Sequence, residues 1–204
     1  KDIRFEHLTV EDGLPTSTIW NITQDHLGFM WFTTSNGLVK YDGYKFTTYQ
    51  PDENDSNSIY TGDLCLPYED LSQNLWIAHY NGMSLYNREA DSFTNYLFDT
   101  DADGTYNNIF WHILEDHTGT LWVGKAKGVL RLVDHPEVYN STENIVEKSY
   151  VHDPEDSTSI FADDVWTLYE DKAGILWLGT DKGLYKYNNE TDNFTRYKPN
   201  KKEN

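Results

Sequence analysis

Asp99, Asp101 and Asp103 stand at alternate positions and are followed at once by a glycine, which is the spacing of an oxygen-ligand calcium loop. The twelfth position of such a loop carries a bidentate glutamate, but here it is Phe110. The stretch also aligns with two other spacers of the chain that are rich in Asp and Ser. We therefore keep the three aspartates as a calcium candidate and favour a solvated linker.

The other reactive side chains form no recognisable catalytic constellation. The 7 histidines include no His-x-x-x-His pair, and no serine or cysteine stands in a nucleophile elbow. Cys65 is the single cysteine, so an internal disulfide and a cysteine-clustered zinc site are excluded. It occupies a position that other copies of a repeat fill with tryptophan, which favours a core role over a nucleophile. We expect no enzymatic activity in this region and no cofactor.

The charge and the aromatic content narrow the class of protein. Lys+Arg 16 against Asp+Glu 34 gives a net charge of −18 over 204 residues, so we expect neither nucleic acid nor an anionic membrane surface as a partner. Aromatic residues make up 15% of the chain, which argues against disorder. No apolar run approaches the roughly 18 residues of a membrane-spanning helix. These features are typical of a folded, acidic, water-exposed domain.

The chain contains four copies of one repeat. Four tryptophans share a local frame: Trp31, Trp76, Trp122 and Trp177. An aspartate stands six residues before each, at Asp25, Asp70, Asp116 and Asp171, and a glycine six residues after each, at Gly37, Gly82, Gly128 and Gly183. The spacing of about 45 residues is that of a propeller blade, whereas a helical solenoid would need a sustained 3.6-residue periodicity that is missing.

Each copy is predicted to form four short strands. In the fourth copy these cover Asp164–Glu170, Leu176–Thr180, Leu184–Tyr187 and Phe194–Tyr197. The Asp-x-x-Gly turn between the first two strands is expected to close through its Asp side chain. The tryptophan of the second strand is expected to fill the wedge between neighbouring blades.

These boundaries predict an all-β fold of four four-stranded antiparallel blades plus one leading strand. The predicted parts are a leading strand at 1–10, blade 1 at 11–50, blade 2 at 51–98, blade 3 at 99–150 with an insertion at 133–149, blade 4 at 151–198 and a tail at 199–204.

The repeats resemble the two-component regulator propeller repeats. The resemblance rests on Gly13-Leu14-Pro15, on the run from Gly28 to Thr34, on Gly37-Leu38-Val39-Lys40-Tyr41 and on Leu176-Trp177-Leu178-Gly179-Thr180. It implies the extracytoplasmic, periplasmic sensor part of a hybrid two-component protein, with seven-bladed propellers and a sensor histidine kinase in the whole protein. It further implies a response to carbohydrate fragments, and contact with a membrane only through parts C-terminal to this region.

Four blades are fewer than the seven that this resemblance implies. Residues 3–9 read as an outer strand that would complete a closing blade, while all four copies already have a fourth strand. We expect a fragment of a seven-bladed propeller that binds the remainder of the propeller and self-associates through its open faces. A self-closed ring of four blades is the alternative.

Candidate ligand residues are sought where the copies differ. The turns between the second and third strands and the spacers between blades should lie on one face of a propeller. That face is predicted to carry the ligand-binding residues Asn36, His79, Tyr80, Asn81, Lys125, Lys127 and Lys182. Aromatic, amide and charged groups in such a mixture suit an oligosaccharide or another small polar ligand.

Three classes of function remain open at this point. The first is a carbohydrate-responsive sensor domain, and the second is a stand-alone protein-interaction propeller without a small-molecule ligand. The third, a propeller enzyme, would need acid and base residues that converge near the channel, and no such group is recognisable.

Overall fold

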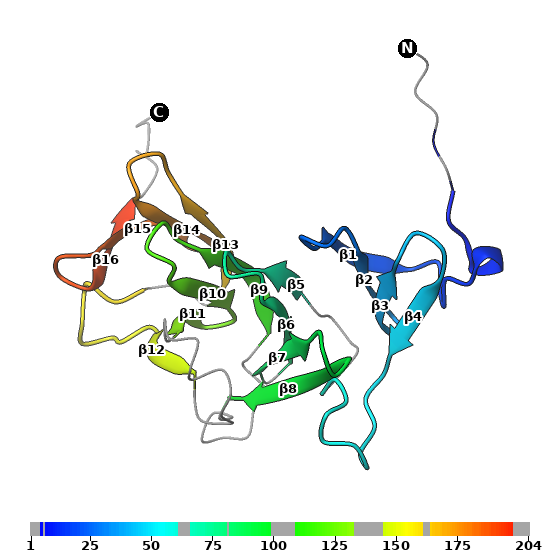
Figure 1. The fold of residues 1–204 in the computed structure, drawn as a ribbon. Helices are drawn as coiled ribbons and strands as arrows, with labels where there is room; N and C mark the ends of the chain where they lie inside the picture. The colour runs from blue at the N-terminus through cyan, green and yellow to red at the C-terminus, as the bar shows by residue number, and fades with distance from the viewer. Residues whose placement is uncertain are drawn as a thin grey trace. The chain divides into compact units, whose positions relative to one another are not determined.

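The computed structural model describes residues 5, 7–60, 66–80, 82–98, 109–132, 145–160 and 164–197 of the chain. Its strands form four antiparallel four-stranded sheets, and each sheet is made of four strands that follow one another in sequence (Figure 1). We call these sheets blades 1 to 4. Before them, the described residues contain one short 3-10 helix, η1 (Val10–Asp12), which Thr9 and Asp12 close with a capping box.

The strands have the following bounds. Blade 1 contains β1 (Ile19–Gln24), β2 (Met30–Thr34), β3 (Gly37–Tyr41) and β4 (Phe46–Tyr49). Blade 2 contains β5 (Leu66–Glu69), β6 (Leu75–His79), β7 (Gly82–Asn87) and β8 (Ser92–Leu97). Blade 3 contains β9 (Phe110–Glu115), β10 (Leu121–Lys125), β11 (Gly128–Leu132) and β12 (Val146–Tyr150). Blade 4 contains β13 (Val165–Glu170), β14 (Leu176–Thr180), β15 (Gly183–Asn188) and β16 (Asn193–Tyr197).

The chain divides into two compact units, Lys1–Asn95 and Tyr96–Asn204. The first unit holds blade 1 and nearly all of blade 2, and the second holds blades 3 and 4. The fold class is that of a partial propeller, and the strands of blade 4 lie within one residue of the predicted ones.

The repeated aspartate closes the first hairpin of each blade. In blade 1, Asp25 Oδ1 accepts hydrogen bonds from the backbone N–H groups of Leu27 (3.1 Å) and Phe29 (2.9 Å). Its other oxygen, Oδ2, accepts the indole Nε1–H of Trp31 at 2.9 Å. The prediction of a self-closing Asp turn is therefore confirmed, and the six-residue spacing has a second cause in the bond to the indole.

The same aspartate-to-indole bond is present in the other three blades. The distances between Nε1 and Oδ2 are 2.8 Å for Trp76 and Asp70, 2.7 Å for Trp122 and Asp116, and 2.8 Å for Trp177 and Asp171. Each blade thus satisfies the one polar atom of its tryptophan inside the blade, and the rest of the ring is available for packing.

The repeated glycine allows the third strand to begin close to the fourth. Gly37 has φ 117°, and a Cβ there would lie 2.4 Å from the carbonyl oxygen of Tyr49. At Gly128, with φ 135°, a Cβ would lie 2.0 Å from the carbonyl oxygen of Tyr150. A side chain at these positions would collide with the neighbouring backbone, so glycine is required for two reasons at once.

The tryptophans of blades 1 and 3 pack against the blade that follows each of them. Trp31 is completely buried in a cluster with Leu38 of its own blade and with Leu75, Tyr86 and Phe93 of blade 2. Tyr86 meets the indole edge-on, with ring centroids 4.8 Å apart. The predicted wedge between blades is therefore confirmed for this pair.

The second unit repeats the arrangement. Trp122 lies in a cluster with Leu176, Leu178, Tyr187 and Phe194 of blade 4, and the Tyr187 ring meets it at 4.8 Å. The two inter-blade cores are thus built from equivalent positions of the repeat.

Two sequence predictions need correction. The described residues of the predicted leading strand, Phe5 and 7–9, form no strand, because a β-strand forms only by pairing and none of the described strands pairs with them. The predicted insertion at 133–149 ends in β12, which pairs with β11 as the fourth strand of blade 3. Residues 133–144 lie outside the described part.

No helix among the described residues is long and apolar enough to cross a membrane.

Candidate functional site

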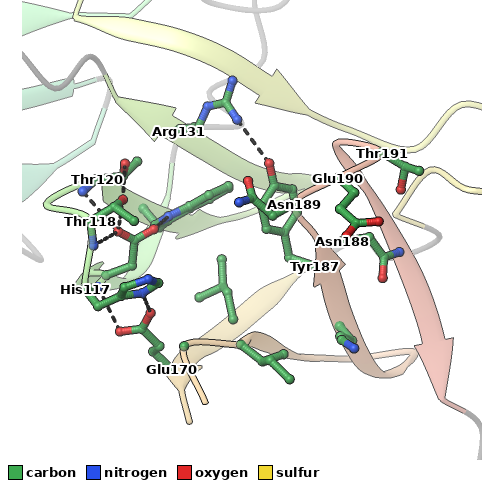
Figure 2. Close-up of a pocket in the computed structure, with 16 residues that line it drawn as sticks. His117, Thr118, Thr120, Arg131, Glu170, Tyr187, Asn188, Asn189, Glu190 and Thr191 are labelled. Atoms are coloured by element: carbon green, nitrogen blue, oxygen red, sulfur yellow. Dashed lines mark hydrogen bonds and ion pairs between the residues drawn. The ribbon is translucent and has the colours of Figure 1, made fainter. Parts of the chain in front are cut away.

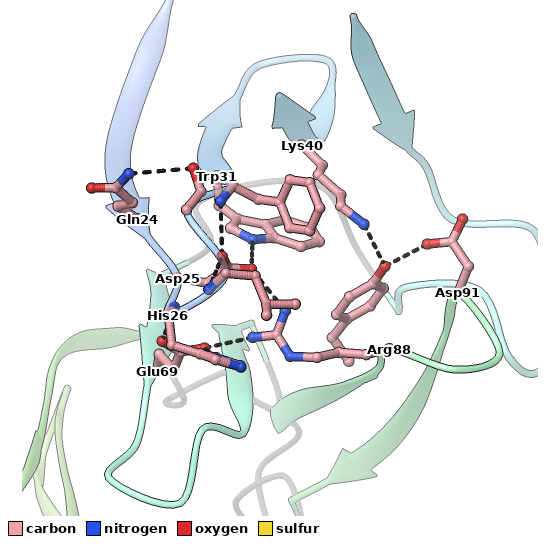
Figure 3. Close-up of polar contacts among 12 residues, drawn as sticks. Gln24, Asp25, His26, Trp31, Lys40, Glu69, Arg88 and Asp91 are labelled. Atoms are coloured by element: carbon pink, nitrogen blue, oxygen red, sulfur yellow. Dashed lines mark hydrogen bonds and ion pairs between the residues drawn. The ribbon is translucent and has the colours of Figure 1, made fainter. Parts of the chain in front are cut away.

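Arg88 crosses the space between blades 1 and 2 (Figure 3). Its guanidinium donates from Nη1 to Asp25 Oδ2 at 2.7 Å and from Nη2 to Glu69 Oε1 at 2.5 Å. The same Oε1 lies 2.8 Å from Nδ1 of His26, whose backbone N–H donates to Glu69 Oε2 at 2.6 Å. One guanidinium therefore joins carboxylates of two blades in a bidentate bridge.

Arg88 supplies the countercharge for a carboxylate that has no contact with solvent. The Asp25 side chain is 0% exposed. Burial raises the pKa of Asp25, but hydrogen bonds from Trp31 and Arg88 outweigh it, so the pKa lies below its ordinary value. Asp25 is therefore ionised in the folded protein, and it depends on these two donors.

Blades 3 and 4 bring together the equivalent carboxylates and imidazole. The backbone N–H of His117 donates to Glu170 Oε2 at 2.9 Å, and His117 Nδ1 bonds to Glu170 Oε1. Asp116 Oδ1 accepts from the backbone N–H groups of Thr118 (2.9 Å) and Thr120 (3.2 Å). The hydrogen bond to Glu170 raises the pKa of His117.

Blades 3 and 4 have no arginine at the position equivalent to Arg88. Arg88 stands twelve residues after the tryptophan of blade 2, and the equivalent position of blade 4 is Asn189. A cavity of about 560 Å³ opens there, and Asn189 lies in its wall together with Asp116, His117 and Glu170 (Figure 2). The shorter side chain leaves open the space that the guanidinium fills between blades 1 and 2.

The wall of this cavity offers several kinds of contact to a polar ligand. It includes the rings of Trp122 and Tyr187, and turn residues with hydroxyl, amide and carboxylate groups. The polar side chains labelled in Figure 2 include Thr118, Thr120, Asn188, Asn189, Glu190 and Thr191. Flat rings beside many hydrogen-bonding groups suit a sugar or another small polar molecule.

A second network accompanies each inter-blade core, and in both it joins two tyrosine hydroxyl groups to one aspartate. Asp91 Oδ1 accepts from the hydroxyl groups of Tyr49 (2.6 Å) and Tyr86 (2.5 Å). Lys40 Nζ donates to the Tyr86 hydroxyl at 3.0 Å. The hydrogen bonds from the two tyrosines lower the pKa of Asp91, and burial opposes them.

In the second unit the acceptor is Asp192. Its Oδ1 accepts the hydroxyl of Tyr187 at 2.6 Å and that of Tyr150, while Arg131 Nη1 donates to the Tyr187 hydroxyl at 3.1 Å. Burial raises the pKa of Asp192, but hydrogen bonds led by the one from Lys148 bring it down to about 2. Since this network occurs beside both cores, we interpret it as structural; the Asn189 cavity distinguishes the second unit.

Four of the predicted ligand residues lie in the turns between second and third strands, as expected from their spacing. They are Asn36, Tyr80, Lys127 and Lys182. The turns of blades 3 and 4 are joined through Asp164, which pairs with Ala126 and accepts from the backbone N–H of Asp181 at 3.2 Å. Their role in ligand binding stays a prediction.

His79 and Lys125 do not present their side chains on a face, and this expectation is corrected. His79 is 1% exposed, with Nδ1 2.7 Å from the carbonyl oxygen of Tyr80 and Nε2 3.0 Å from Ser84 Oγ. Burial lowers the pKa of His79 to about 4, against the hydrogen bond to Tyr80. Lys125 is 6% exposed and donates to the carbonyl oxygen of Ala126 at 3.2 Å.

The remaining candidates lie outside the described residues. These are Asn81, Cys65 and the calcium candidate Asp99, Asp101 and Asp103. Within the described ranges, no group of three or more His, Cys, Asp or Glu side chains is placed to hold a metal ion.

The cavity lies at the end of the strands opposite to the one that the sequence predicted. Its walls come from the β9–β10, β13–β14 and β15–β16 turns, whereas the predicted residues lie in the second-to-third turns at the other end. The signal that could have found it is the exchange of Arg88 for Asn189 between the aligned second and fourth copies. This exchange can be interpreted only when Arg88 is known to bridge two blades.

Comparisons with known proteins agree with this architecture. The profile of the two-component regulator propeller family matches residues 13–36 and 159–182. A 55-residue segment, 27% of this chain, is 42% identical to Histidine kinase P4 of Formosa agariphila and covers 4% of that protein.

Two solved structures share the fold. The extracellular domain of BT3049, a candidate hybrid two-component system of B. thetaiotaomicron, is 28% identical, with a TM-score of 0.56, over 93% of this chain and 31% of that one. The corresponding domain of BT4673 from the same organism is 24% identical, with a TM-score of 0.70, over 88% of this chain and 25% of that one. The chain thus spans less than a third of each relative. Residues 13–36 and 159–182 thus match the two-component regulator propeller repeat, and the described strands form four blades of a partial propeller.

Proposed function

We propose that this chain is part of an extracytoplasmic sensing propeller of a hybrid two-component protein. The observation that carries the proposal is the 28% identity to the extracellular domain of BT3049 over 93% of the chain. The short match to a histidine kinase supports the same type of protein. The signalling output would belong to parts of the protein outside these 204 residues.

The periplasm is the compartment that this function requires. A fusion of alkaline phosphatase after residue 197, in the natural gene and host, is expected to be active, because that enzyme matures only outside the cytoplasm. An inactive but stable fusion protein would contradict the proposed location.

A carbohydrate fragment is the proposed signal. Its support is the cavity between blades 3 and 4, where the rings of Trp122 and Tyr187 and the side chains of Asn188, Asn189 and Thr191 offer stacking and hydrogen bonds. Calorimetric titration of the 204-residue chain with a panel of oligosaccharides tests this ligand class.

The outer face of blade 4 supports a second role, the binding of another blade. Tyr169, Leu184 and Tyr197 are exposed there to 60%, 43% and 46%, and they lie around Trp177. The equivalent tryptophans of blades 1 and 3 are covered by the following blade. We propose that this face binds the remainder of a larger propeller, and that copies of this chain associate through it when the remainder is missing.

Sedimentation at rising protein concentration tests this association. The chain is expected to form oligomers, because a contiguous apolar face is removed from water on contact. The variant Tyr169→Glu/Leu184→Glu should stay monomeric, and Leu27→Glu, a change at another exposed leucine, serves as its control. A wild-type chain that stays strictly monomeric would refute both the open face and the self-association.

A further inference from the structure

The two inter-blade spaces share an aspartate, a histidine, a glutamate and a tryptophan, and at the position of Arg88 the second space has Asn189. Asp25, His26 and Glu69 in the first unit correspond to Asp116, His117 and Glu170 in the second, and the hydrogen bonds among them are the same. The tryptophan indole binds the same carboxylate oxygen in both.

The first unit shows what these groups bind. The Arg88 guanidinium bridges Asp25 Oδ2 and Glu69 Oε1, and its central carbon lies 5.9 Å from the centre of the Tyr86 ring. His26 occupies Glu69 at the same time, so the histidine does not prevent the guanidinium from binding. The carboxylates and the tyrosine face together form a guanidinium site.

The second unit keeps these carboxylates and the tyrosine, and it has Asn189 in place of the Arg88 guanidinium. Asp116 Oδ2 accepts a hydrogen bond from the indole of Trp122 at 2.7 Å. A carboxylate oxygen can accept two hydrogen bonds, and at Asp25 Oδ2 the second one is donated by Arg88. Glu170 and the Tyr187 ring also face the cavity. The Glu170 side chain is 16% exposed, close to the 13% of Glu69.

Three cationic side chains lie in the cavity wall, and two of them, Arg131 and His117, are bonded to carboxylates. Arg131 is paired with Glu147 at 2.8 Å and with Asp192 at 3.2 Å. The pKa of Asp171 is lowered mainly by its hydrogen bond from Trp177, while burial opposes this change. The charge of Lys186 makes a smaller contribution in the same direction. His117 takes the place that His26 takes beside Arg88. None of the three stands at the Arg88 position.

We propose that the cavity between blades 3 and 4 binds a guanidinium group of its ligand, which bridges Asp116 Oδ2 and Glu170 Oε1 as Arg88 bridges their counterparts. The group belongs either to a small alkylguanidinium or to an arginine side chain. The inference rests on the proposal that this cavity is a ligand site, and it names a second ligand class, distinct from the oligosaccharide, that the acidic end of the cavity selects.

Titration calorimetry with ethylguanidinium at millimolar concentrations tests it, with ethylammonium as the matched cation. Ethylguanidinium is expected to bind at one site and at least about tenfold more tightly, because an ammonium group cannot make the bidentate bridge. The affinity of a blocked Gly-Arg-Gly tripeptide, with Gly-Lys-Gly as its charge control, is compared with that of ethylguanidinium. This comparison distinguishes the peptide source from the small-molecule source. Equal binding of the two small cations, or no binding of either, would overturn the proposal, whatever oligosaccharides do.

Asn189→Arg is the decisive variant, because it supplies the internal guanidinium. It is expected to abolish ethylguanidinium binding and to raise Tm, while Asn189→Gln keeps the binding. The converse variant, Arg88→Ala, should gain a second ethylguanidinium site and recover part of its lost Tm in its presence. If Asn189→Arg does not fold, Glu170→Gln takes its place and is expected to weaken binding at least about tenfold. Unchanged affinity in the folded variant would refute the assigned site.

Discussion

Replacing Trp31 by alanine is expected to lower the free energy of unfolding of the first unit by about 3–5 kcal/mol, the range for a large aromatic side chain lost from a core. Trp31 is completely buried, and its ring contacts Tyr49 and Tyr86. The change also leaves Asp25 without one of the donors that hold its buried charge. Urea unfolding followed by fluorescence and circular dichroism measures the loss.

Trp177→Ala is the matched control for this prediction. Trp177 makes the same bond to its aspartate, Asp171, at 2.8 Å, but it lies against the open face of blade 4. Its replacement should therefore cost clearly less, and the difference between the two variants reports the packing of one blade on the next. Equal losses would show that the tryptophan stabilises only its own blade and would contradict the wedge interpretation.

Removing Arg88 has the second largest expected effect. Arg88→Ala is expected to lower the free energy of unfolding by about 2–4 kcal/mol at pH 7, because Asp25 remains buried and charged with its countercharge gone. We place the value below that of a fully buried pair, because the Arg88 side chain is 23% exposed. Arg88→Lys keeps the charge without the two-pronged bridge and should lose an intermediate amount.

The pH dependence of this loss has a definite sign. Asp25 has a pKa below its unfolded value, so it contributes stability above that value, near 3.9, and the contribution is lost as pH falls through the folded pKa. In Arg88→Ala, burial still raises the pKa of Asp25 while one opposing donor is gone. The stability difference between wild type and variant should therefore shrink below about pH 4. A difference that stays constant from pH 7 to pH 3 would show that Arg88 acts by packing alone.

The repeat itself made most of the fold predictable. The hairpins depend on local chemistry, an aspartate that accepts nearby N–H groups and a glycine that the next strand crowds, and both recur at fixed spacing. The wedge role of tryptophan followed from its regular placement. The bond from Trp31 Nε1 to Asp25 did not, because it joins the turn after β1 to a side chain on β2 and depends on the observed side-chain geometry.

The site was harder to predict than the fold. His79 and Lys125 differ from their counterparts in other copies, but they end the strands β6 and β10, where neighbouring side chains cover them. The ring of Tyr60, for example, is stacked on that of His79 at 5.2 Å. At His79 and Lys125 the variation between copies therefore reflects different packing. At Asn189 it reflects the presence of a cavity. Only the contacts between blades separate the two cases.

One measurement tests the sensing role most directly: autophosphorylation of the full-length natural protein in membrane vesicles, with and without an oligosaccharide mixture. We predict that the oligosaccharides change the rate in the wild type and leave it unchanged in Asn189→Arg, whose added side chain fills the cavity between blades 3 and 4. A full-length protein without kinase activity, or a response that is the same in both proteins, would contradict the account.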